Sequence, residues 1–526
     1  MAPILSKIKD RNLFILLLLL AIPAFTLNLG LIPFIGDEGI RSLVALEMHL
    51  SGDYLVPTMN GETYLNKPPL YNWIILLFSK LFGFFGEIPA RSATLFFLGL
   101  FAFWVFRFTR KELGFYSAAS SALMLLTCGR ILFWDSMLGL IDIGFSALIY
   151  LNFMLLYTLG KNGKWMAFFI TSYALCAAGF LLKGLPAVVF QAISIPIALV
   201  LHGELKRRFF SLKHILGGLV FLILAGAYYV LYAREVSLQT AFAVLLDQSL
   251  QRTATHHGIG KTIGHLFTFP FDSVYHFLPW SLLILLLFQP RFRQWIGEND
   301  FVKFNFWMLA ANLLIYWSSV QVYPRYLLMF VPLFNTICLY AWQQTPESHW
   351  SRRILHTTFP LAGAIVLVAV LLSPLYPRLH TLPGGLWLSW LAVVAPLGFS
   401  VWGLWTDKPR VFFWLVGALL AVRIGLDLLV LPFRNEDLFT HDTRADAQRI
   451  VAEHPTSQLW FWRDTVRDNV VRFYLTEASG YIIRRTDTLH KPGDLYISQP
   501  TYARDYPGVI IDSVRSESGR FLPIFR

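Results

Sequence analysis

The chain contains one polar stretch that directly follows its first hydrophobic segment. It begins with Gly36-Asp37-Glu38-Gly39-Ile40-Arg41 and ends with Gly61-Glu62-Thr63-Tyr64-Leu65-Asn66-Lys67-Pro68-Pro69. Around this stretch the sequence is almost continuously apolar. Acidic residues and a lysine at the mouth of an apolar membrane bundle need a physical reason to be there. The stretch therefore indicates where the polar chemistry of an apolar chain is located.

The composition is that of an integral membrane protein. Of 526 residues, 56% are hydrophobic and 14% are charged, whereas ordinary soluble domains contain roughly 25% charged residues. A bilayer core requires about 20 apolar residues per helix, and such runs recur from Leu13 to Pro432. We predict a polytopic all-α membrane protein with about thirteen transmembrane helices. They are expected to begin near residues 13, 87, 114, 138, 165, 184, 215, 271, 303, 326, 359, 385 and 411.

The positive charges lie at alternate ends of these predicted helices. The formal net charge is +12, and Lys and Arg cluster near residues 107–111, 161–164, 206–213, 291–293, 352–353 and 408–410. Positively charged loops stay cytoplasmic, so we expect a cytoplasmic N-terminus and, with an odd helix count, an external C-terminal tail. This pattern indicates a membrane orientation and not nucleic-acid binding. The same orientation assigns to the outer face Asp37, Lys67, Asp142, Lys183, the loop 234–270 and Arg325.

Two regions are not simple membrane spans. Residues 36–86 mix polar and apolar residues at helical spacing, which predicts short helices along the membrane surface, with an interfacial or re-entrant helix after Pro69. From Arg434 onward the composition is that of a soluble domain. There we predict helices over 444–453 and 466–475 and strands over 458–462, 481–484, 494–498 and 509–514. The expected domains are thus a transmembrane domain, 1–433, which includes the outer loop 36–86, and a small α/β domain, 434–526.

Several charged residues allow a structural and a functional interpretation. Asp142 lies in an apolar segment and either contacts a neighbouring helix or faces a polar cavity. Lys183 either extends to the interface or serves the site, and Arg325 with Tyr326 is either an interfacial anchor or part of the site. Other residues are assigned to structure. These are Arg423 and Asp427 as an ion pair on one helix, the loop residues His256 and His257, and Cys128, Cys176 and Cys338 as packed thiols.

The polar stretch resembles the first outer loop of a known enzyme family. Asp37, Glu38 and Glu47, followed by Asn60-Gly61, Tyr64 and Lys67-Pro68-Pro69, match the spacing in bacterial polyprenyl-phosphate-sugar-dependent glycosyltransferases. These enzymes are related to protein O-mannosyltransferases and to the aminoarabinose transferase that modifies lipid A. Further similar pieces are the helix carrying Asp142, the Lys183-Gly184 turn, Pro279-Trp280 and Arg325-Tyr326-Leu327-Leu328 with Pro332.

The resemblance implies the C-type glycosyltransferase (GT-C) fold in the bacterial inner membrane, with the tail in the periplasm. It also implies inverting transfer of a monosaccharide from a polyprenyl-phosphate donor to a lipid, glycan or protein acceptor. Asp37 would be the essential carboxylate, Asp142 its partner, and Lys67 the cation facing phosphate. The remaining candidate substrate-binding residues are Glu38, Arg41, Tyr64, Asn66, Lys183, Arg252, Arg325 and Tyr326.

The sequence departs from the aminoarabinose enzymes at two positions. Ile40 stands where they carry an arginine, with Arg41 next to it, and Asn66 replaces a glutamate. Their acidic-histidine pair is also not clearly present, and Asp247, Gln248 and Arg252 occupy about that place. Aminoarabinose and lipid A are therefore not carried over as substrates, and the acceptor stays open.

The chemistry of the reaction suits these residue types. Fixed cations stabilise the phosphate that leaves, for which Lys67 with Lys183 or Arg325 is suited. Asp37 is the candidate base for a hydroxyl acceptor. A divalent cation (Mg²⁺, Mn²⁺ or Zn²⁺) held by Asp37 and Asp142 is left open.

Three alternative functions remain at this point. One is a lipid-linked oligosaccharide polymerase or ligase, which would use a similar donor. The second is a glycolipid transporter, which the clustering of polar residues at one face disfavours. The third is a sensor whose tail recognises a ligand. The sequence contains no P-loop, dinucleotide-binding fingerprint or zinc-ligand spacing.

Overall fold

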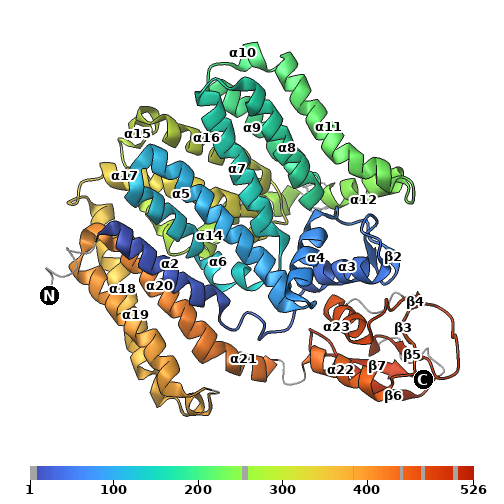
Figure 1. Ribbon diagram of the computed structural model, residues 1–526. Coiled ribbons are helices and arrows are strands. Elements are labelled where there is room, and N and C mark those ends of the chain that lie inside the picture. Colours follow the sequence, from blue (N-terminus) through green and yellow to red (C-terminus); the bar gives the residue numbers. More distant parts are fainter. Residues whose placement is uncertain (1–8, 251–258, 383, 439–441, 464–467, 501–507) are drawn as a thin grey trace.

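The computed structural model describes residues 9–250, 259–382, 384–438, 442–463, 468–500 and 508–526. It is a bundle of long helices followed by a small domain with a mixed sheet (Figure 1). The small domain, drawn in orange and red, lies beside the blue segments α3 and α4 of the first loop (Figure 1). The predicted combination of a helical membrane region with a small mixed domain is thus confirmed in outline.

Eight stretches of helix are long and apolar enough to cross a membrane, among the described residues. They are α5 (Glu87–Leu126), α7 (Ile141–Lys161), α8 (Trp165–Lys183), α11 (Leu212–Tyr232), η3 (Pro324–Phe330) with α17 (Val331–Gln344), α18 (Trp350–Leu372) with η4 (Ser373–Leu375), α19 (Leu386–Thr406), and η6 (Lys408–Arg410) with α20 (Val411–Gly425), η7 (Leu426–Val430) and the start of α21 (Leu431–Leu438). The chain is a multi-pass membrane protein. The count of thirteen spans stays a prediction.

Other helices lie at or near the remaining predicted spans. These are α2 (Asp10–Thr26), α9 (Pro186–Leu201), α14 (Ile259–His276) and α16 (Asp300–Trp317). The spans predicted to begin near residues 87 and 114 are the two arms of α5, which breaks at Gly114 because its φ of 80° and ψ of 179° are not helical. The span predicted near residue 271 differs. Helix α14 starts earlier and ends at His276, and after Pro279 a 3-10 helix, η2 (Trp280–Leu287), follows.

Short helices join the long ones. They are α6 (Gly129–Phe133), η1 (Asp135–Met137), α10 (Leu205–Arg208), α12 (Leu238–Leu250), α15 (Phe292–Glu298) and η5 (Pro377–Thr381). Buried phenylalanine, leucine and tryptophan side chains fill the space between the long helices, and Trp280 and Trp414 are each 1% exposed. Arg423 and Asp427 form the expected ion pair within one helix, at 2.9 Å. The three cysteines are buried free thiols, also as expected.

The first loop consists of α3 (Asp37–Ser51), the antiparallel hairpin β1 (Thr58–Met59) and β2 (Glu62–Thr63), and α4 (Leu70–Phe82). The buried Glu47 carboxylate holds this hairpin. It accepts hydrogen bonds from the Asn60 N–H at 2.5 Å, the Gly61 N–H at 3.1 Å and the Thr58 hydroxyl at 2.8 Å. The predicted short helices of this region are present.

In its described residues, the tail forms a five-stranded mixed sheet with two helices. The elements are α22 (Thr443–Glu453), β3 (Leu459–Trp462), α23 (Asn469–Ser479), β4 (Arg485–Thr486), β5 (Leu495–Ile497), β6 (Ile510–Arg515) and β7 (Phe521–Phe525), in the sheet order β4-β3-β5-β7-β6. Strand β3 pairs in parallel with β4 and β5, whereas β7 pairs antiparallel with β5 and β6. The strand predicted over 481–484 lies slightly later, and β7 was not predicted because Pro523 interrupts its strand pattern.

The tail packs closely on the first loop. A Cβ atom on Gly39 of α3 would lie 2.9 Å from the backbone of Asn469 and Val470 at the start of α23, so the two helices touch through their backbones. The Phe34 N–H donates to the Tyr474 hydroxyl at 2.9 Å. That hydroxyl donates in turn to Glu87. The tail therefore holds the segment that leads into Asp37.

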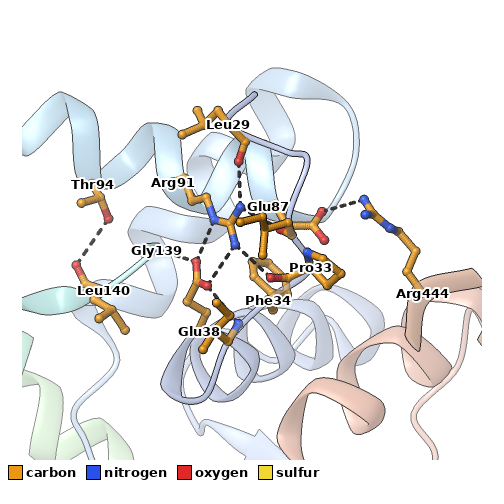
Figure 2. A network of polar contacts seen from close by, with 12 residues as sticks. Leu29, Pro33, Phe34, Glu38, Glu87, Arg91, Thr94, Gly139, Leu140 and Arg444 are labelled. Atoms are coloured by element: carbon orange, nitrogen blue, oxygen red, sulfur yellow. Dashed lines mark hydrogen bonds and ion pairs between the residues drawn. The ribbon is translucent and has the colours of Figure 1, made fainter. Parts of the chain in front are cut away.

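Figure 2 shows the buried polar network beneath this contact. Arg91 of α5 binds Glu38 through two hydrogen bonds of 3.0 and 3.1 Å, and it also donates to the carbonyls of Leu29, Ile32 and Pro33. One turn earlier on α5, Glu87 pairs with Arg444 of the tail at 3.4 Å. The network thus joins α5, the first loop and the tail (Figure 2).

Candidate active site

Two carboxylates and two cations from four separate elements meet at one point. The Arg325 guanidinium lies 2.9 Å from one oxygen of Asp37 and 3.3 Å from one oxygen of Asp142. The other oxygen of Asp142 lies 2.5 Å from the Lys183 ammonium group. Hydropathy and charge predicted that these four residues share one face, and the structure brings them together.

The ends of helices position these groups. Asp37 is the first residue of α3, and Asp142 lies in the first turn of α7, where the helix dipole favours a negative charge. Lys183 is the last residue of α8, where the dipole favours a positive charge, and Gly184 ends the helix with a φ of 88°. Arg325 is the second residue of η3, directly after Pro324. The local sequence therefore places each charge at an element's end.

Exposure differs sharply among these four groups. The side chains of Asp142 and Lys183 are 5% and 6% exposed, that of Arg325 is 15% exposed, and that of Asp37 is 52% exposed. The charges of the buried pair are screened little by water. Asp37 is therefore the carboxylate of the site that is open to a substrate.

Aromatic rings surround the cations. The Lys183 ammonium nitrogen lies 4.2 Å from the centre of the Tyr326 ring and 4.9 Å from that of Phe145. The Arg325 guanidinium lies 4.7 Å from the centre of the Tyr323 ring. Such rings attract a cation through their negative faces and limit its access to water.

Arg41 is a second buried cation of the first loop. It is 8% exposed and lies 5.7 Å from the centre of the Tyr64 ring. Within the described residues Arg41 forms no ion pair. The hydroxyl of Tyr71, which bonds Thr94 at 3.1 Å, lies within electrostatic range of both Arg41 and Asp142. Since a buried unpaired charge is unfavourable, Arg41 is suited to receive an anion.

Lys67 and Asn66 lie in the loop between β2 and α4, close in sequence to Tyr64. Lys67 is half-buried and has contacts of its own, and Asn66 is exposed. Their predicted roles towards the donor stay predictions. Arg252, together with His256 and His257, lies outside the described residues. Asp247 is an exposed residue of α12.

The predicted substrate-binding role of Glu38 requires an accessible side chain, and the Glu38 side chain is not accessible. It is fully buried, and its carboxylate binds Arg91 and accepts hydrogen bonds from the N–H groups of Ile35 and Gly139. All of these partners are protein groups. Glu38 therefore holds the loop in place, and Arg91, which sequence reasoning missed, is its partner.

The donor set at Asp37 and Asp142 does not fit a divalent cation. Both oxygens of Asp142 already face Lys183 and Arg325, and Asp37 faces Arg325 as well. Both Asp142 oxygens and one Asp37 oxygen thus already face cationic side chains. Elsewhere in the described residues, Glu453, His454 and Asp512 have metal-ligand spacing, but Arg449 binds both Asp512 at 2.7 Å and Glu453 at 3.1 Å.

A further ion pair that the sequence did not reveal lies beside the site. Arg130 and Asp135 are 3.0 Å apart, and Asp135 is within electrostatic range of Asp142 and Arg325. Burial raises the pKa of Asp135 to about 6. The sequence shows this charged pair inside an apolar stretch. It does not show that Asp135 lies within electrostatic range of Asp142 and Arg325.

One protein-family model matches a segment in the first half of the chain. Residues 66–230 match the protein-family model described as dolichyl-phosphate-mannose-protein mannosyltransferase. The predicted family resemblance is confirmed. The matched segment contains Lys67, Asp142 and Lys183, whereas Asp37 and Arg325 lie on either side of it.

Two solved structures share the fold over nearly the whole chain. One is ArnT from Cupriavidus metallidurans bound to undecaprenyl phosphate, with a TM-score of 0.71, 17% identity and 98% of each chain covered. The other is the same protein in the apo state, with a TM-score of 0.66, 17% identity and 97% of each chain covered. The chain therefore has the ArnT-like GT-C fold.

One curated relative also matches the sequence. It is an uncharacterized protein of Aquifex aeolicus (strain VF5), 25% identical over 321 residues, which are 60% of this chain and 61% of the relative. The match thus spans less than two thirds of that relative's length.

Proposed function

We propose that this protein is an inverting glycosyltransferase that moves one monosaccharide from a polyprenyl phosphate to an acceptor at the outer face of the bacterial inner membrane. The observation that carries this proposal is the exposed Asp37 carboxylate, which is joined through Arg325 to the buried Asp142–Lys183 pair. The family match and the ArnT-like fold support it. The cytoplasmic N-terminus and periplasmic tail are part of the proposal and rest on the distribution of positive loops.

The cations of the site are suited to a phosphate leaving group. As the bond between the anomeric carbon and the phosphate oxygen breaks, its electron pair stays on the phosphate, whose negative charge grows. Arg325 and Lys183 carry fixed positive charges in a largely buried setting, where such charges act more strongly than in water. Arg41, which has no ion-pair partner among the described residues, and Lys67 of the same loop add to this field.

Asp37 is suited to act as the base. In the proposed reaction an acceptor hydroxyl oxygen forms a bond to the anomeric carbon on the face opposite the phosphate, so the configuration inverts. The hydroxyl proton passes to the Asp37 carboxylate. Asp142, held between Lys183 and Arg325, positions the arginine that in turn positions Asp37.

The test uses the purified full-length protein with radiolabelled undecaprenyl-phosphate sugar. We expect release of undecaprenyl phosphate by the wild type and a loss of about 10²–10⁴ in the rate for Asp37→Asn, the usual contribution of a general base. Glu62→Gln, an exposed acidic residue of the same loop, is the matched control. Unchanged activity in a folded Asp37→Asn variant contradicts the mechanism.

A further inference from the structure

We propose that a cavity between the first loop and the tail is the acceptor subsite, and that it takes the uncharged, hydroxyl-rich headgroup of a saccharide. This inference rests on the proposed function and deepens it. The cavity has a volume of about 870 Å³. The first loop contributes Gly36 and Asp37 to its wall, and the tail contributes Asp468, Asn469, Gln499, Ser516, Glu517, Ser518, Arg520 and Phe521 among others.

Asp37 belongs to both this cavity and the charged site of the membrane bundle. Its carboxylate faces Arg325, and the residue also lines the tail cavity. A donor phosphate beside Arg325 and an acceptor in the cavity would therefore both lie next to Asp37. A displacement in which Asp37 acts as the base requires the acceptor hydroxyl to lie beside this carboxylate.

The tail wall of the cavity is built from interlocking hydrogen bonds. The Gly36 N–H donates to Glu517 at 2.9 Å, and the Glu517 N–H donates to Asp468 at 2.7 Å. The second oxygen of Asp468 accepts from the N–H groups of Val470 and Val471 at the start of α23. The β6–β7 turn is thus fixed at the same time to the first loop and to α23.

The lining favours hydroxyl groups over anions. Among the lining residues, the carboxylates of Asp37, Asp468 and Glu517 stand against the single cation Arg520, and Asp37 also faces Arg325 of the membrane bundle. Desolvation, together with Asp468, Glu38 and Asp37, raises the pKa of Glu517, which reflects this negative surrounding. A phosphate-bearing acceptor would meet repulsion here.

The neutral groups of the lining have the chemistry that sugars require. The Ser518 hydroxyl and the Asn469 and Gln499 amides include both donors and acceptors of hydrogen bonds. The Ser516 hydroxyl is buried, and it bonds to the Ser518 hydroxyl and accepts from the Arg520 N–H. Phe521 is 51% exposed and offers an apolar face to a sugar ring. A few polar groups beside an apolar surface are typical of small-molecule sites. A hydroxyl acceptor also needs a base, which Asp37 supplies, whereas an ionised phosphate does not.

The experiment separates donor binding from transfer. Purified full-length protein in nanodiscs is given radiolabelled undecaprenyl-phosphate mannose, glucose or arabinose, one at a time, with membranes from source cells that lack the gene. Ser518→Trp fills the cavity, and Phe521→Ala removes its aromatic face. Thr456→Trp, in an exposed turn on the same domain, is the matched control. We expect Ser518→Trp to lower transfer at least tenfold and Phe521→Ala several-fold, with unchanged affinity for the donor, while Thr456→Trp behaves as wild type.

Mild acid then reports the atom that received the sugar, because a glycosyl phosphate is cleaved under conditions that a glycoside survives. We expect an acid-stable product. An acid-labile product overturns the hydroxyl acceptor, and full transfer by both cavity variants overturns the subsite. A wild type that binds none of these donors and transfers nothing instead contradicts the proposed function itself.

Discussion

Arg325 connects the exposed and the buried carboxylate of the site through different nitrogens of one guanidinium group. One nitrogen faces Asp37 and another faces Asp142. A lysine has a single ammonium group and cannot reproduce this planar fork. The position of the Asp37 carboxylate thus depends on the shape of the Arg325 guanidinium group as well as on its charge.

This difference gives a direct prediction. Arg325→Lys keeps the charge but loses the bridge, so we expect the rate of transfer to fall at least tenfold while the protein stays folded. Arg353→Lys, an exposed residue of α18, is the matched control. Transfer rates and thermal unfolding of both variants are to be measured side by side. An Arg325→Lys variant as active as Arg353→Lys would show that the bridge is dispensable.

Asp135 makes stability depend on pH beside the site. Its folded pKa of about 6 lies above the ordinary value of 3.8, so the folded state binds the proton more tightly than the unfolded chain. Lowering the pH through that window therefore stabilises the folded protein through this group. We expect the melting-temperature advantage of the wild type over Asp135→Asn to grow as the pH falls from about 7 to about 5. An advantage that shrinks over this range argues against a raised pKa.

Among the elements, the contact of α3 with α23 is the closest point between the two parts of the chain. The added methyl group in Gly39→Ala would lie 2.9 Å from the α23 backbone, which cannot rotate away as a side chain can. We expect destabilisation of about 1–3 kcal/mol, the usual cost of overpacking. Gly218→Ala in α11, where nothing lies within 4 Å, is the control and should not destabilise the protein. Thermal unfolding measures both, and equal effects would contradict the close contact.

The Glu38–Arg91 pair tests the buried network in the same way. Arg91→Met leaves Glu38 without its counter-charge, and breaking a buried pair costs about 3–5 kcal/mol. Arg207→Met, whose side chain is 74% exposed, is the control. We expect a large fall in the melting temperature for Arg91→Met and little change for Arg207→Met. A small fall in the melting temperature for both variants would mean that surrounding contacts, and not the Glu38–Arg91 ion pair, stabilise the buried network.

The helices and strands can be predicted from the local sequence more completely than the contacts between them. Long apolar runs predict the positions of α7, α8 and α11, and the β-rich tail pattern predicts β3, β5 and β6. The pairing of Glu38 with Arg91 and of Gly36 with Glu517 joins residues far apart in the chain. No periodicity in the sequence encodes such pairings, so the cavity in the tail was not foreseen, whereas the gathering of Asp37, Asp142, Lys183 and Arg325 on one face was.

For the whole molecule, the tail contacts the segment that leads into Asp37, so the proposed mechanism involves the tail as well as the membrane bundle. Removal of residues 434–526 would delete Tyr474 and Glu517, the partners of Phe34 and Gly36. We expect such a truncated protein to lose transfer at least a hundredfold but to keep most of its donor affinity, because Asp142, Lys183 and Arg325 all remain. Donor binding and transfer in nanodiscs would distinguish these effects. Wild-type transfer without the tail would refute the arrangement.

Two consecutive residues, Gly36 and Asp37, bond to opposite halves of the molecule, one to the tail and the next to the membrane bundle. This junction constrains the design of hybrid proteins. A tail grafted from a relative would have to bring a matching version of residues 34–39 with it, since a mismatch there would misdirect the carboxylate even if each half folded correctly. We therefore expect that acceptor specificity can be transferred to a hybrid protein only together with residues 34–39.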